Sequence, residues 1–135
     1  MSRRGKWLVM CPASRALPMA DVLEKIKMPR EAKAALDGEV LVLTVPTADG
    51  EEAELWVWLS TEEVVADEAV EFTEEYGAER ADRDQIATYD ARYVIAWNLA
   101  ESEYVFETYY TLAFRLTDAV GGITLDLIEK TFVEA

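Results

Sequence analysis

Histidine is absent from the 135 residues of this chain, and that absence bears first on catalysis. Histidine is the commonest general base near neutral pH and a usual ligand of catalytic zinc. A glycine-rich phosphate loop and a Gly-x-Ser-x-Gly motif are absent as well. The sequence therefore argues against an enzyme. We assign no catalytic residue and expect no cofactor.

Cysteine is nearly absent, since Cys11 is the single one. It has no partner for an internal disulfide, which agrees with a reducing compartment. Arg15 stands four residues further on and could lower the pKa of the thiol. A lone cysteine at the end of a strand is otherwise an inert core residue, and the sequence leaves both interpretations open.

Long apolar runs are missing too. The longest, such as VLVLTV, are far too short to cross a bilayer. The first residues, MSRRGKWLVMCPAS, lack the sustained apolar region of a secretory signal. We expect a cytoplasmic protein without a membrane partner.

Positive charge is scarce, and it is unevenly placed. The net charge is −14, from 13 basic and 27 acidic residues. Residues 1–33 hold eight Lys or Arg against three acids, whereas the remaining 102 residues hold five against 24. The acidic part of the chain after residue 33 repels phosphate backbones and attracts cations. We therefore expect no nucleic acid among its partners and predict a basic protein partner.

What the chain does contain is enough apolar material for a core. With 51% hydrophobic residues, residues 1–135 suit one domain, in which 1–5 are expected to be flexible. Strands are predicted at residues 6–11, 39–46 and 53–60, the last two joined by a hairpin turn at Asp49-Gly50. Both of these hairpin strands are apolar on alternate and on intervening positions. This pattern indicates either that both faces of the strands are covered within the protein or that a second molecule covers one face.

Helical spacing predicts a helix at residues 19–28. Pro29 either breaks this pattern or opens a second short helix, 29–36, with Gly38 as its stop signal. Residues 91–99 read as an interior strand, followed by a helix at 103–120 that Ser102 can cap. Gly121-Gly122 then turns the chain into a strand at 123–128, which 130–133 extends or pairs with. The fold class predicted is α+β, a single domain with a mixed or antiparallel sheet, helices packed on it and a C-terminal strand-helix-strand unit.

Residues 60–79 carry eight carboxylates and no cationic side chain. Ser60 or Thr61 can cap a helix here, and Glu63 has the spacing of a capping box with Ser60. An apolar stripe runs along one side of this predicted helix, and Gly77 ends it. The stripe comprises Val65, Ala69, Phe72 and Tyr76. The carboxylates project mostly away from it.

This acidic helix is the predicted partner-binding site. Its residues are Glu62, Glu63, Asp67, Glu68, Glu71, Glu74 and Glu75. Charge runs often serve only solubility, and clustered carboxylates can bind a divalent cation weakly. The functional interpretation is an electrostatic docking face for a basic protein. We predict no dedicated metal site, because the calcium-like stretch 82–87 has Ala87 in place of the required glycine and Tyr93 in place of the closing glutamate.

Aromatic residues form a second candidate surface. Trp56 and Trp58 lie on the same side of a predicted strand, while Phe106, Tyr110 and Phe114 follow one another at helical spacing. Both sets are either core or an exposed interface. If they are exposed, a homodimer is the economical explanation.

Asp126 interrupts an otherwise apolar strand and is the most interesting single carboxylate for an enzyme. The alternative is a strand residue that faces solvent beside Thr124. A carboxylate-dependent enzyme is the least favoured function, because it needs a cleft in which two such groups have separated pKa values.

The C-terminal arrangement of strand, helix and Gly-Gly-Ile-x-x-Asp (Gly121, Gly122, Ile123, Asp126) resembles small acidic immunity proteins of bacterial polymorphic-toxin systems. The resemblance covers the last third of the chain. It implies stoichiometric binding of a toxin domain without catalysis. It assigns no functional residue, because such proteins bind through divergent surfaces.

The favoured prediction is thus a cytosolic, non-enzymatic binding protein, such as an immunity or inhibitor protein, that docks a basic partner. The alternative is a small acidic secretion-type chaperone or homodimeric adaptor, which holds a client on exposed apolar strands and helices. Salt separates the two, since charge-based docking weakens strongly as ionic strength rises.

Overall fold

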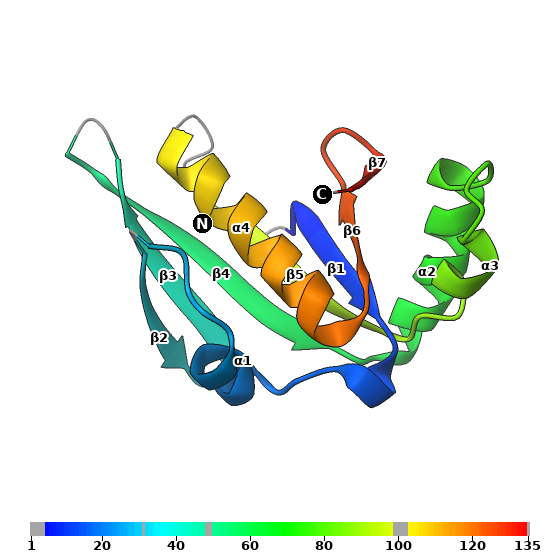
Figure 1. The fold of residues 1–135 in the computed structure, drawn as a ribbon, viewed down its shortest axis with the longest axis horizontal. Coiled ribbons are helices and arrows are strands. Elements are labelled where there is room, and N and C mark those ends of the chain that lie inside the picture. The colour runs from blue at the N-terminus through cyan, green and yellow to red at the C-terminus, as the bar shows by residue number, and fades with distance from the viewer. Residues whose placement is uncertain (1–4, 31, 48–49, 99–102, 135) are drawn as a thin grey trace.

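A computed structural model describes residues 5–30, 32–47, 50–98 and 103–134. In these residues seven strands form one antiparallel sheet with the order β2-β3-β4-β5-β1-β6-β7 (Figure 1). The strands are β1 (Trp7–Cys11), β2 (Lys33–Asp37), β3 (Val40–Pro46), β4 (Glu52–Ser60), β5 (Ala91–Trp97), β6 (Ile123–Asp126) and β7 (Thr131–Val133). The prediction of a single α+β domain is confirmed, and the sheet is antiparallel throughout. The predicted flexibility of residues 1–5 concerns a segment of which 1–4 lie outside the described residues.

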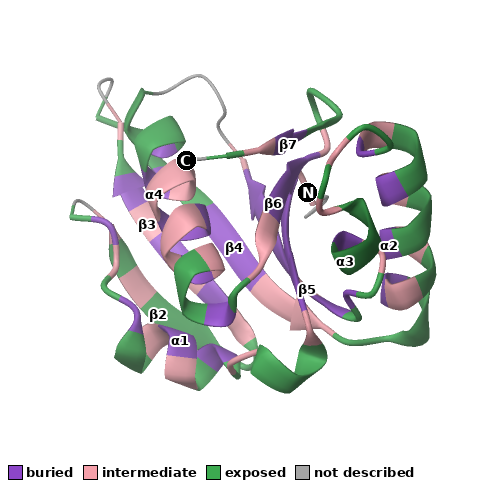
Figure 2. Cartoon of the chain, turned by 45° about the vertical axis from the view of Figure 1, so that its right-hand side comes forward, coloured by how far each residue is buried: buried purple, intermediate pink, exposed green. Residues whose placement is uncertain are grey.

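Helices lie on both faces of this sheet (Figure 2). They are α1 (Met19–Lys25), α2 (Glu63–Tyr76), α3 (Arg83–Ile86) and α4 (Glu103–Val120), with a short 3-10 helix, η1 (Ala13–Arg15). Figure 2 shows α1 and α4 on one side of the sheet and α2 and α3 on the other. The molecule thus has three layers, and α2 belongs to an outer one.

Each face of the sheet has its own apolar cluster, because successive side chains of a strand point to opposite faces. On β1, Trp7 and Val9 belong to the cluster beneath α1 and α4. Leu8 and Met10 belong to the smaller cluster beneath α2 and α3. All five residues of β1 are buried, which explains why this strand reads as a continuous apolar run.

The central strands β5 and β1 connect distant parts of the chain. Trp7 lies opposite Ile95 of β5 on one side and opposite Asp126 of β6 on the other. The interior strand predicted at 91–99 is confirmed as β5, and the predicted C-terminal strand-helix-strand unit is confirmed as β5, α4 and β6. β7 pairs with β6, which decides between the two alternatives of extension and pairing in favour of pairing.

The short helix predicted at 29–36 is wrong, because residues Lys33–Asp37 form strand β2. β2 pairs antiparallel with β3 from Lys33 opposite Thr44 to Asp37 opposite Val40. Gly38, read from the sequence as a helix stop, instead has a φ of 62° in the two-residue turn between these strands. Glycine at the first position of such a turn is typical of a type II′ hairpin.

The hairpin predicted between β3 and β4 is confirmed, with Pro46 opposite Glu52. Asp49 of its turn lies outside the described residues, and so does the predicted helix cap Ser102. The Gly121-Gly122 turn is confirmed by a φ of 66° at Gly121.

Candidate docking surface

Helix α2 is fixed to the sheet by one side of its surface. Val65, Ala69 and Thr73 are buried, and the Thr73 hydroxyl donates to the carbonyl oxygen of Ala69 at 2.6 Å. Phe72 and Tyr76 are half-buried and stack on each other with ring centroids 6.1 Å apart. The predicted apolar stripe is confirmed, with Thr73 as an additional buried member. The packing of this side holds α2 in place, so the side chains on its outer side have fixed positions along the helix.

The outer side carries carboxylates. Six of the seven predicted site residues are exposed, namely Glu62, Glu63, Asp67, Glu71, Glu74 and Glu75. Within the described part of the chain, no ion pair joins any of these six to a cation. The structure therefore brings most of the predicted acidic residues together on one surface, and their charge is not neutralised by a described arginine or lysine.

Glu68 is the exception. Its carboxylate accepts a hydrogen bond from the Arg92 guanidinium at 2.8 Å, in an ion pair where the Arg92 side chain is 16% exposed. Arg92 lies on β5, so this pair fastens α2 to the sheet. We accordingly exclude Glu68 from the docking surface, which we define as Glu63, Asp67, Glu71 and Glu74 with their neighbours Glu62 and Glu75.

The predicted capping box at the start of α2 is wrong. Ser60 is the last residue of β4, and Glu62 occupies the N-cap position without a side-chain hydrogen bond to the helix. The last turn contains no basic residue, and Glu74 and Glu75 stand there near the negative end of the helix dipole. Like charges four residues apart, such as Glu63 with Asp67, also repel each other. Helix stability therefore does not explain this charge pattern.

Two exposed valines interrupt the carboxylates. Val64 and Val70 are 46% and 42% exposed. Val70 lies within one helical turn of Asp67, Glu71 and Glu74. A partner on this side would meet apolar area as well as charge.

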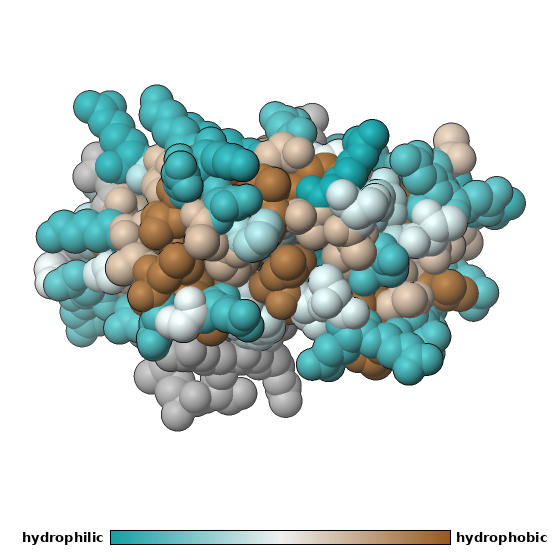
Figure 3. All heavy atoms as spheres, turned by 90° about the horizontal axis from the view of Figure 1, so that it is seen from below, coloured by the Kyte–Doolittle hydropathy of each residue, from teal (hydrophilic) through white to brown (hydrophobic). Residues whose placement is uncertain are grey.

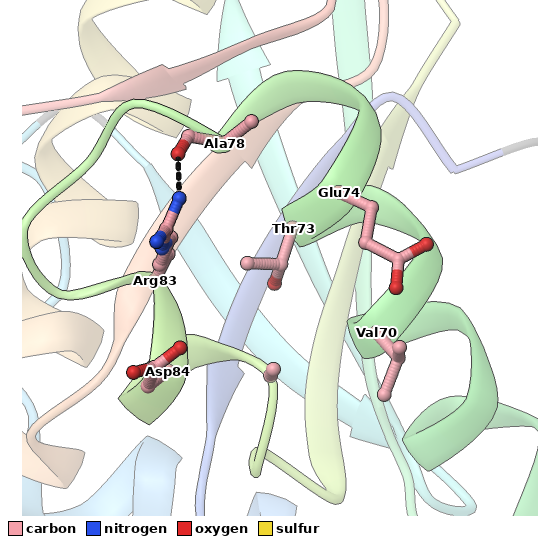
Figure 4. Close-up of a pocket in the computed structure, with 7 residues that line it drawn as sticks. Val70, Thr73, Glu74, Ala78, Arg83 and Asp84 are labelled. Carbon is pink, nitrogen blue, oxygen red and sulfur yellow. Dashed lines mark hydrogen bonds between the residues drawn. The ribbon is translucent and has the colours of Figure 1, made fainter.

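A hollow of about 320 Å³ lies between α2 and α3. Arg83, the cation that lines it, does not pair with any described carboxylate of the acidic surface. Figure 4 shows Arg83 turned toward Ala78, to whose carbonyl oxygen it donates at 2.6 Å, while the Glu74 carboxylate points to the other side. Asp84 also lines this hollow, but its carboxylate and that of Glu74 are turned away from each other (Figure 4). This pair therefore lacks the facing arrangement that acid/base hydrolysis requires.

The predicted aromatic residues lie on two different faces of the sheet. Trp56 and Trp58 share one side of β4, as predicted, on the face of the smaller cluster; Trp56 is buried and Trp58 half-buried. Phe106, Tyr110 and Phe114 follow the length of α4 on the opposite face, with Phe106 46% exposed. Tyr110 contacts both neighbours, at centroid distances of 5.5 and 4.6 Å. The structure therefore does not join the two sets into one surface.

On the face of the molecule seen from below, hydrophilic side chains lie between the hydrophobic ones (Figure 3). Figure 3, the view from below, shows several hydrophobic groups near the middle with hydrophilic side chains between them. The right-hand end, where Figure 1 places α2 and α3, carries many hydrophilic side chains.

Cys11 and Asp126, the two candidates for chemistry, both have structural roles. Burial raises the pKa of the Cys11 thiol to about 11, and the Asp90 carboxylate adds to that rise, so the interpretation of a thiol activated by Arg15 is wrong. Asp126 is only 9% exposed, which contradicts the solvent-facing interpretation. Its carboxylate accepts from the backbone N–H groups of Ile128 and Glu129 at 2.8 and 3.0 Å and so holds the turn between β6 and β7.

Among the described residues, no group of three or more acidic or cysteine side chains is arranged to hold a metal ion. None of the helices there is both long enough and apolar enough to cross a membrane.

Sequence reasoning missed Arg92. The sequence does contain a sign of its role, because Arg92 is the one charged residue in the apolar strand Ala91–Trp97. A lone cation at an interior position of a sheet needs a counter-charge on the layer above it. The acidic helix is the segment that supplies one.

Comparison of the chain with protein-family models, with curated proteins and with solved structures finds no match.

Proposed function

We propose that this protein is a non-enzymatic binding protein that docks a basic protein partner on the outer side of α2. The observation that carries this proposal is a set of six exposed carboxylates that form no ion pair with any described residue, on a helix fixed by its opposite side. The pattern lowers helix stability through like-charge repulsion, and it is therefore better explained by a partner than by the fold.

The physical basis of such docking is complementary charge. A concentrated negative surface speeds the encounter with a positive one and penalises partners of the wrong sign. Val64 and Val70 add apolar area that a partner can bury. We propose stoichiometric capture in the cytoplasm, as by a toxin-neutralising immunity or inhibitor protein, and the single buried Cys11 fits a reducing compartment.

Charge reversal on α2 tests this proposal. The variant Glu63→Lys, Asp67→Lys, Glu71→Lys and Glu74→Lys changes only exposed side chains, so the free energy of unfolding should change by less than about 1 kcal/mol. Capture of basic proteins from an extract of the source organism, quantified by mass spectrometry, should fall at least tenfold, because attraction becomes repulsion.

The matched control reverses four exposed acids elsewhere, namely Glu24, Glu107, Asp118 and Glu129. It alters the net charge by the same amount but leaves α2 intact. The control should retain capture. Equal capture by wild type and the α2 variant, or an equal loss in both variants, would overturn the proposal.

A client-binding adaptor is the second candidate, and the exposed aromatic residues of α4 favour it. Tyr104 and Phe106 are 45% and 46% exposed at the start of this helix. Binding through them would persist at about 1 M salt, where the Debye length is about 3 Å. Docking through α2 would weaken there, so the salt dependence of capture distinguishes the two functions.

A further inference from the structure

Strand β2 is an unpaired edge of the sheet. It is the first strand in the order β2-β3-β4-β5-β1-β6-β7, and four of its five residues are exposed. Figures 1 and 2 place it at the outer boundary of the molecule, at the opposite end of the molecule from α2. An edge of this kind presents free N–H and C=O groups that can pair with another strand.

The register with β3 shows which backbone groups are free. Asp37 and Val40 flank a two-residue turn and so exchange backbone hydrogen bonds with each other. Hydrogen-bonded and non-hydrogen-bonded pairs alternate along an antiparallel ladder. The N–H and C=O groups of Ala34 and Leu36 therefore point outward from the sheet.

The sequence of β2, Lys-Ala-Ala-Leu-Asp, is complementary to itself in the antiparallel direction. If two copies pair around a two-fold axis at Ala35, Lys33 of each copy stands opposite Asp37 of the other. The dimer therefore contains two such Lys–Asp pairs. Ala34 stands opposite Leu36 of the second copy, so the outward backbone groups of these residues face each other. Opposite charges in directly facing positions stabilise a strand pair, and like charges destabilise it.

The side chains also fit a close approach of two copies. Ala35 is small and meets Ala35 of the second copy on the axis. Leu36 is 37% exposed, and a second copy would cover it with Ala34. Neither contact requires a bulky residue to move.

Charged residues usually protect an edge strand from unwanted pairing. In β2 the charges stand only at the two ends and have opposite signs. They oppose pairing in a shifted register but favour pairing with an identical strand. The other edge, β7, has only three residues, Thr131–Val133, and offers less backbone to a partner.

We propose that two copies of this protein associate through β2, antiparallel and centred on Ala35, into a dimer with one continuous sheet. The symmetry is the closed two-fold type that most homodimers use, and it consumes both β2 edges.

A charge-swap experiment tests this dimer. Lys33→Asp alone and Asp37→Lys alone each turn both facing pairs from attractive to repulsive. Each should raise the dissociation constant of the dimer about tenfold, measured by sedimentation equilibrium from about 5 to about 500 µM protein. An equimolar mixture of the two variants restores both opposite-charge pairs and should form a heterodimer, and the double variant Lys33→Asp with Asp37→Lys should again form a homodimer.

Lys130→Asp and Asp118→Lys make the same charge changes at exposed positions away from β2 and serve as controls. They should leave the dissociation constant within about twofold of wild type. A wild-type protein that stays monomeric over the whole concentration range would overturn the proposal. So would a dimer that neither single variant weakens, or a mixture of the two variants that fails to associate.

Discussion

At the scale of single residues, the hydroxyl group of Tyr93 ties the segment after β1 to the middle of the sheet. It accepts a hydrogen bond from the Leu17 N–H at 2.6 Å and donates to the Leu17 carbonyl oxygen at 2.7 Å. Tyr93 is fully buried on β5, and burial raises its pKa to about 12. One side chain therefore satisfies both backbone groups of a residue far away in sequence.

Tyr93→Phe should lower the free energy of unfolding by about 1 to 3 kcal/mol, because it leaves both backbone groups of Leu17 without their partner. Urea denaturation measures this change. Tyr104→Phe removes a hydroxyl from an exposed tyrosine and should change stability by less than about 0.5 kcal/mol. Equal effects of the two substitutions would contradict the role assigned to Tyr93.

The buried thiol of Cys11 predicts a loss of stability in alkali. Its pKa rises from 9.0 to about 11 on folding, so between these values the unfolded chain releases the proton and the folded chain keeps it. The stabilising contribution is fully present below pH 9 and is lost as the pH rises toward 11. By about pH 10 the free energy of unfolding should fall by about 1 kcal/mol on this account.

Cys11→Ala removes this titration and should flatten the decline between about pH 9 and pH 10, whatever its effect on stability at neutral pH. Urea denaturation across this range gives the slope. Tyr93, whose pKa rises from 10.0 to about 12, begins to contribute near pH 10 and contributes mostly above it. An unchanged slope in the variant would show that the thiol does not titrate as the structure requires.

At the scale of elements, the turn between α4 and β6 places two glycines under different constraints. Gly121 has a φ of 66°, whereas a Cβ atom on Gly122 would overlap the carbonyl oxygen of Met10. The backbone of β1 cannot move aside there, because both neighbouring strands pair with it.

Gly122→Ala should therefore lower the free energy of unfolding by about 3 kcal/mol, as overpacking of a core does. Gly121→Ala meets only the Arg15 side chain, which can move, and should cost about 1 kcal/mol from its positive φ. Thermal or urea unfolding gives the order of the two variants. A larger loss of unfolding free energy in Gly121→Ala than in Gly122→Ala would contradict this explanation.

The elements that the sequence predicted well are those whose apolar pattern matches their final burial. β1 is apolar throughout, β5 is apolar except for Arg92, and both are central strands. Helical spacing also predicts an apolar stripe of five residues on α4, and four of them, Val105, Leu112, Leu116 and Val120, are buried. The fifth member, Tyr109, is half-buried and stacks on Trp97 at a centroid distance of 4.0 Å. Periodicity carries this information locally, so no distant contact was needed to find these elements.

Strand β2 could not be predicted in this way. Its alanines, leucine and lysine favour a helix, and Pro29 stands where a helix could begin. Pairing with β3 overrides that local preference, and Gly38, the first residue of the hairpin turn, resembles a helix stop when it is read locally. In the candidate site, the exposure of the carboxylates followed from helical periodicity. The lone charge of Arg92 in an apolar strand predicts a counter-charge, but it does not identify Glu68, which lies in a different layer of the fold.

At the scale of the whole molecule, the acidic surface on α2 and the β2 edge lie at opposite ends of the molecule (Figure 1). If two copies pair through β2, the two α2 helices face away from the interface. A dimer of this kind would be bivalent, and binding at two sites raises the overall affinity for a partner that presents repeated basic surfaces. This consequence depends on both proposals, whereas each proposal is tested without the other.

Carboxyl footprinting of α2 tests the central claim most directly. Carbodiimide-driven labelling of accessible carboxylates, mapped by mass spectrometry, should modify Glu63, Asp67, Glu71 and Glu74 in the free protein and spare Glu68, which is paired with Arg92. In complex with a captured basic protein, labelling of these four residues should fall several-fold, while Glu24, Asp118 and Glu129 keep theirs. Unchanged labelling of the α2 carboxylates in the complex, or protection that falls on other carboxylates instead, would contradict the account.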